Sequence, residues 1–112
     1  MQATTLDSLQ GFWQSKEDNK FVIQIKGLHK ISIYANREID DEGFNLDDSC
    51  LKEVNKNNEL KSNGNFLIGL DSNRASCFEI VSLLEKHLTL RGETSGKFLI
   101  FKRIKKIKPV IE

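Results

Sequence analysis

The sequence predicts an all-β fold, an eight-stranded antiparallel up-and-down barrel. Eight short segments alternate apolar and polar residues, a period-2 pattern typical of strands with one buried face. Most links between these segments are too short for a crossover helix, so successive strands are expected to pair antiparallel. The chain has a single proline and makes its turns with Asn, Asp and Gly. Eight consecutive strands remove their exposed edges by closing into a barrel.

The strand segments follow one another along almost the whole chain. They are expected at residues 11–15, 20–26, 29–35, 44–46, 65–70, 75–83, 86–91 and 96–102. Turn-forming residues separate them at 18–19, 27–28, 40–43, 71–74, 84–86 and 92–96. The stretch 47–63 is different, because it is polar and rich in Asn, and it predicts one helical turn at most and then a loop.

The apolar side of each segment predicts the lining of the barrel. The expected inward residues are Phe21, Ile23, Ile25, Ile31, Ile33, Phe44, Phe66, Ile68, Phe78, Ile80, Leu88 and Leu90. No charged side chain is expected among them. An eight-stranded barrel is just wide enough for its own side chains, so a set this rich in Phe leaves little volume for a ligand.

Two ends of the chain resemble one known family. Residues 9–13, Leu-Gln-Gly-Phe-Trp, resemble the Gly-x-Trp that opens the first strand of lipocalin-like barrels. Residues 78–80, 88–90 and 101–103 resemble the closing strands of small bacterial lipocalin-like (calycin) domains. In that family a last-strand Arg packs over the first-strand Trp and closes one end of the barrel. The resemblance covers about residues 9–104 and implies that Trp13 and Arg103 form this structural pair.

Gly11 precedes the tryptophan by two residues and has no side chain, so it leaves room for a large group to approach. We therefore expect a structural role for Gly11 beside Trp13 and Arg103. The chain divides into an N-terminal extension (1–8), a lipocalin-like barrel domain (9–108) and a C-terminal tail (109–112).

Composition narrows the class of protein. Apolar residues make up 38%, charged residues 29%, and the net charge is +1. These values are typical of a soluble globular domain and argue against nucleic acid as a partner. No apolar run is long enough for a transmembrane segment, and the first ten residues lack a signal-peptide pattern. We expect a cytoplasmic protein as written, or an exported one, periplasmic or lipid-anchored, if a leader precedes it.

No catalytic or metal-binding signature is present. His29 and His87 lie far apart outside any ligand motif and are expected on the surface or rim. The acidic run at 38–43 lacks the bidentate glutamate of a calcium loop, and Glu79 is expected to point outward. We therefore expect a protein that is not an enzyme, with no cofactor and no metal.

The cysteines and the basic C-terminus each leave an alternative open. We expect Cys50 and Cys77 to be free thiols; a disulfide would need an oxidising compartment. The lysines of residues 97–108 are expected to protect an edge strand from aggregation, and the alternative is contact with phosphate or anionic lipid.

The expected function is a non-catalytic binding module for a small apolar molecule. The expected ligand-binding residues are Ile23, Ile25, Ile33, Tyr34, Phe66, Ile68, Phe78, Ile80, Leu90 and Arg91. His29, Tyr34 and Arg91 could orient a head group such as a carboxylate. The alternative is a protein-interaction or inhibitor module that uses the outer barrel face and the loops. The sequence leaves the ligand, the partner and the oligomeric state open.

Overall fold

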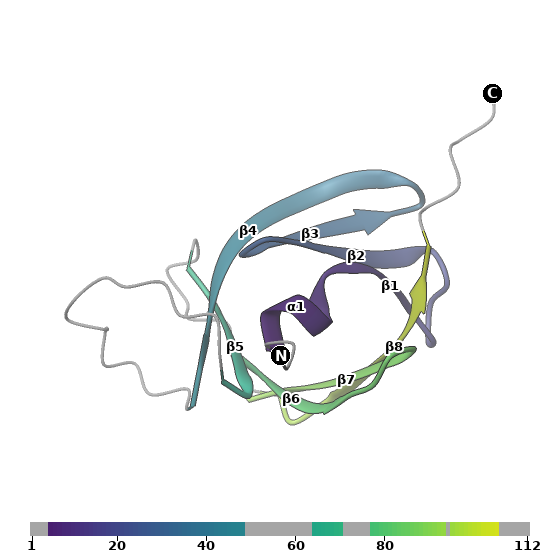
Figure 1. Cartoon of the computed structure of the whole chain (residues 1–112). Helices are drawn as coiled ribbons and strands as arrows, with labels where there is room; N and C mark the ends of the chain where they lie inside the picture. The colour runs from purple at the N-terminus through teal and green to yellow at the C-terminus, as the bar shows by residue number, and fades with distance from the viewer. Residues whose placement is uncertain (1–4, 49–63, 71–76, 94, 106–112) are drawn as a thin grey trace.

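The computed structural model describes residues 5–48, 64–70, 77–93 and 95–105, which fold into a closed antiparallel barrel (Figure 1). The elements are α1 (Thr5–Leu9), β1 (Gly11–Ser15), β2 (Phe21–Lys26), β3 (His29–Tyr34), β4 (Arg37–Asp47), β5 (Phe66–Gly69), β6 (Cys77–Leu83), β7 (His87–Gly92) and β8 (Phe98–Ile104). Each strand pairs with its sequence neighbour, and β8 pairs back onto β1. The predicted fold class is confirmed.

The chain connections define two ends of the barrel. One end, the helical end, carries α1 and the turns at 27–28 and 84–86. The other, the distal end, carries the connections at 16–20, 35–36 and 93–97. Figure 1 shows α1 in purple inside the outline of the strands. Leu9 of this helix belongs to the core cluster, and Leu6 packs against it.

The turn expected at 40–43 is wrong. The chain turns earlier, at Ala35 and Asn36, whose φ angles are 50° and 67°. Two positive φ angles are typical of the two-residue hairpin loop that matches the twist of paired strands. Residues 40–43 instead belong to β4, an eleven-residue strand that pairs first with β3 and then with β5. Residues 37–41 are exposed, which is why this strand tolerates so many charges.

Ala35 gives a stability prediction, because a left-handed conformation is costly for a residue with a Cβ and less so for Asn. We expect Ala35→Asn to raise the free energy of unfolding by about 0.5–1 kcal/mol. Ala35→Val should lower it, because a branched Cβ fits this conformation worst. Urea unfolding of both variants tests the turn, and an equal effect of the two substitutions would contradict the assigned geometry.

The inward face of two strands differs from the prediction. Ile25 is buried in the core and lies directly opposite Lys30, so the inward residues of β3 are Lys30, Ser32 and Tyr34. Leu67 is the core residue of β5, which turns its neighbours Phe66 and Ile68 outward. Ile31, Ile33, Phe66 and Ile68 therefore do not line the lumen, contrary to expectation.

Ile33 is buried for another reason. It lies opposite Val22 on the outer side of the β2–β3 pair, and the two side chains are only 4% and 5% exposed. They form a small apolar contact separate from the lumen. The lumen itself holds one apolar cluster, which consists of Leu9, Trp13, Ile23, Ile25, Phe44, Leu46, Leu67, Leu88, Leu90 and Phe101.

The helical turn and loop expected within 47–63 lie almost entirely outside the described residues. Asp47 is the last residue of β4, and the description resumes at Gly64.

Candidate functional site

The helical end of the barrel is closed by Trp13, Arg103 and α1. Trp13 is fully buried and donates a hydrogen bond from Nε1 to the Leu9 carbonyl, at 2.8 Å. The Arg103 guanidinium lies over the indole, 4.2 Å from the ring centroid. The contact implied by the family resemblance is therefore present.

Arg103 also satisfies carbonyl groups that the end of a helix leaves unpaired. Its Nη2 donates to Ser8 O at 2.7 Å and its Nη1 to Gln10 O at 2.6 Å. Its Nε donates to Glu85 O, at 2.6 Å, in the turn between β6 and β7. One side chain thus joins the last strand, α1 and a turn, so this end has a structural role.

Gly11 and Gln10 complete this closure. Gly11 has a φ of 119°, and a Cβ there would meet Arg103 Nη1 at 2.8 Å, so glycine makes room for the guanidinium. The Gln10 side chain holds the β2–β3 turn, because its Oε1 accepts from Gly27 N at 2.8 Å and its Nε2 donates to Gly27 O at 3.0 Å.

The inner face of β3 is polar, although the sequence pattern predicted an apolar one. Lys30, Ser32 and Tyr34 project to the side on which β2 places Phe21, Ile23 and Ile25. Lys30 and Ser32 are half-buried, whereas Tyr34 is 41% exposed at the distal end. The isoleucines of β3 face the other way. One inner wall of a mostly apolar lumen is therefore polar.

Lys30 reaches toward the opposite side of the barrel. Its Nζ lies 4.9 Å from the centre of the Phe78 ring, which packs against the core cluster from β6. Burial lowers the pKa of this lysine, and the charges of Glu42 and Asp40 partly oppose that shift. The lumen thus holds an amine that loses its proton more readily than a surface lysine.

Two carboxylates of β4 accompany this amine. Glu42 lies directly opposite Lys30 in the β3–β4 pair and is only 9% exposed. Asp40 lies opposite Ser32 and is exposed. The inner surface near Lys30 therefore combines a cationic group, a buried carboxylate, a hydroxyl and an aromatic face.

The distal end adds aromatic surface. Phe21 lies opposite Tyr34 and packs on Phe101 with ring centroids 6.2 Å apart. A hydrogen bond to the Asp18 carboxylate raises the pKa of the Tyr34 phenol. A ligand that reached Lys30 from this end would pass these groups.

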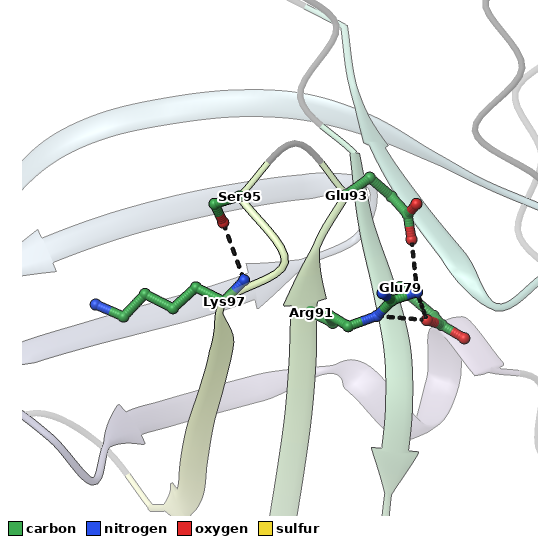
Figure 2. Close-up of polar contacts among 5 residues, drawn as sticks. All are labelled: Glu79, Arg91, Glu93, Ser95 and Lys97. Atoms are coloured by element: carbon green, nitrogen blue, oxygen red, sulfur yellow. Dashed lines mark hydrogen bonds and ion pairs between the residues drawn. The ribbon is translucent and has the colours of Figure 1, made fainter.

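Arg91 lies on the outer face and is already engaged. Figure 2 shows its guanidinium between two carboxylates. Its Nη2 lies 2.6 Å from Glu79 Oε1 and 3.3 Å from Glu93 Oε1, and its Nε donates to the same Glu79 oxygen at 3.0 Å. These contacts raise the pKa of Arg91. Glu79 points outward as expected, and Arg91 does not reach the lumen.

The connection between β7 and β8 is tied locally beside this group. Ser95 Oγ accepts from the backbone N–H of Lys97 at 3.1 Å (Figure 2). Lys97 also lies 3.8 Å from Glu17 in the β1–β2 connection. The expected edge strand is absent, because β8 pairs with β7 on one side and with β1 on the other, so the lysines of β8 do not cover a free edge. Lys106 and Lys108 lie outside the described residues.

The structure separates the expected ligand-binding residues into two groups. Those on the lumen side are Ile23, Ile25, Tyr34, Phe78, Ile80 and Leu90; those on the outer side are Ile33, Phe66, Ile68 and Arg91. His29 is outward as well, with its Nδ1 3.0 Å from Asp41 Oδ1.

Sequence reasoning missed Lys30, Ser32 and Glu42, although a signal for them was present. The two-residue connection at 27–28 pairs Lys26 with His29 and therefore Ile25 with Lys30. Opposite residues share a face, so an inward Ile25 requires an inward Lys30.

The expectation of a free thiol at Cys77 is wrong. Cys77 is disulfide-bonded, and the described part of the chain holds no free cysteine. The sequence has one other cysteine, Cys50, which lies outside the described residues. Among the described side chains, no cluster of three or more His, Cys, Asp or Glu residues could hold a metal ion.

Comparison with protein families, curated proteins and solved structures gives no match to this chain. Within the ranges that the structure describes, no helix is long and apolar enough to span a membrane. The eight-stranded antiparallel barrel agrees with a lipocalin-like fold.

Proposed function

We propose that this barrel is a non-catalytic binding protein that takes a small amphipathic molecule into its lumen from the distal end. The observation that carries the proposal is the inward face of β3, where Lys30 and Ser32 stand in place of apolar residues. Placing charged groups in an apolar interior costs stability compared with packing apolar side chains there. A binding role explains why the sequence keeps them.

The ligand follows from the groups around Lys30. An ammonium beside an aromatic ring can donate to a carboxylate, sulfonate or carbonyl oxygen. Phe21 and Phe78 offer apolar surface for the remainder of the molecule. The head group that the sequence analysis assigned to His29, Tyr34 and Arg91 is thereby assigned to Lys30, because His29 and Arg91 lie on the outer face. The resemblance to small bacterial calycin domains is consistent with this proposal.

A fluorescent anilinonaphthalene sulfonate probe tests the proposal. We expect saturable binding with a Kd below about 10 μM, and displacement by dodecanoate more readily than by dodecanol. Lys30→Met should weaken probe binding roughly tenfold, because it removes a charge-assisted hydrogen bond. Lys26→Met is the matched control, since Lys26 is exposed on the same hairpin and should leave the Kd unchanged.

Two results would contradict binding in the lumen. Probe binding that is insensitive to Lys30→Met, or no saturable binding, would remove the basis of the proposal. The folded state of each variant is checked by near-ultraviolet circular dichroism of Trp13.

A second candidate function uses the outer surface. Val81, Phe98 and Ile100 are 47%, 50% and 42% exposed, and Phe98 and Ile100 share the outward face of β8. Large exposed apolar side chains close together are typical of protein-binding surfaces. A protein partner on this face would be lost in a Phe98→Ser variant that still binds the probe normally.

A further inference from the structure

We propose that Lys30 is a carbonyl-trapping amine, which binds an aldehyde ligand reversibly as an imine inside the barrel. This inference rests on the proposed lumen function and narrows its ligand class. The inference is based on the position of Lys30. Its side chain is half-buried on the inner wall, its Nζ faces the Phe78 ring, and Glu42 lies directly opposite on β4.

An imine requires an unprotonated amine, and burial makes this form easier to reach at Lys30 than at an exposed lysine. Burial of the Lys30 side chain, which lies opposite Ile25, has the largest effect on its pKa and lowers it. Glu42 and Asp40 are the charged groups that face it from β4, and both act in the opposite direction more weakly. Lysines in apolar surroundings are the ones that form Schiff bases with carbonyl compounds.

The chemistry needs no oxidant or reductant. The unprotonated Nζ attacks the aldehyde carbon, and a carbinolamine forms. Loss of one water from the carbinolamine leaves the C=N bond, so one amine and one aldehyde give one imine and one water. The Glu42 carboxylate, opposite Lys30 on β4, can take the proton that the nitrogen loses in the addition and return it to the departing hydroxyl. The apolar cluster beside the amine limits hydrolysis of the product by excluding water.

The experiment is reductive trapping with nonanal and cyanoborohydride at neutral pH, with the aldehyde below one equivalent. The hydride converts an imine into a stable secondary amine that peptide mass spectrometry locates. We expect Lys30 to be labelled faster than the exposed Lys26 and Lys102 of the same molecules, because burial lowers its pKa and leaves more of it as free amine. Dodecanoate should suppress labelling at Lys30 and leave the two exposed lysines unaffected.

Two controls keep the test decisive. Lys30→Arg keeps the positive charge but has no primary amine, so it should retain the sulfonate probe and lose the fast label. Glu42→Gln should slow trapping relative to probe binding, because an amide cannot relay the proton from the nitrogen to the departing hydroxyl. Uniform labelling of all exposed lysines, together with Lys30-dependent probe binding, would overturn the imine and leave the binding function intact. Loss of both would overturn the binding function itself.

Discussion

Replacing Trp13 with alanine should lower the free energy of unfolding by about 3–5 kcal/mol, as expected for truncating a large buried aromatic side chain. The indole is fully buried, its Nε1 donates a hydrogen bond to Leu9 O, and the Arg103 guanidinium packs on its face. The substitution therefore removes core packing and loosens the link between α1 and the last strand.

Phe98→Ala is the matched control, because Phe98 is an aromatic residue of the same barrel that is 50% exposed. Urea unfolding followed by far-ultraviolet circular dichroism measures both variants. We expect the control to lose less than about 1 kcal/mol. A comparable small loss in Trp13→Ala would mean that the indole is not the floor of the barrel.

Reduction of the disulfide at Cys77 should lower the free energy of unfolding by about 2–4 kcal/mol, the usual contribution of a bridge in a small domain. Cys77 opens β6, and its carbonyl accepts from Glu93 N at 3.1 Å, so the bond holds a strand end that is already paired. Unfolding with and without a reductant measures the effect.

A thiol titration decides whether the bridge exists in solution. Denatured, unreduced protein should show no free thiol, and a variant with serine at both Cys50 and Cys77 should be insensitive to reductant. Two free thiols in the unreduced protein would contradict the structure. A stable bridge would also favour an oxidising compartment.

Much of the fold was predictable because barrel topology follows from local signals. Period-2 segments and short connections specify eight antiparallel strands, and the Gly-x-Trp and the terminal Arg indicated which strands meet at closure. The helix α1 was missed because five residues carry little periodicity. Its only signal is the spacing of Leu6 and Leu9, which pack into the core.

The candidate site was predicted less well, because strand alternation does not say which face is inward. The isoleucines of residues 29–34 suggested an apolar inner face, and the register across the 27–28 turn reverses that face. The prediction that Phe66 and Ile68 face inward was wrong for the same reason. Leu67, which lies between them, is the core residue of this strand, so its two neighbours face outward. The turn at Ala35 carries neither Gly nor Pro at its first position, which allowed the acidic run to be taken for the turn instead.

We propose that a ligand binds in the lumen beside Lys30. Amide chemical-shift mapping of nitrogen-15-labelled protein, titrated with dodecanoate, tests it most directly. We predict saturable shifts at Lys30, Ser32, Phe78 and Gly92, which share the inner face, with the outer Phe98 and Ile100 unchanged. The same titration of Lys30→Met should need roughly ten times more ligand. Shifts confined to Phe98, Ile100 and Val81 would place binding on the outer face and contradict a lumen site.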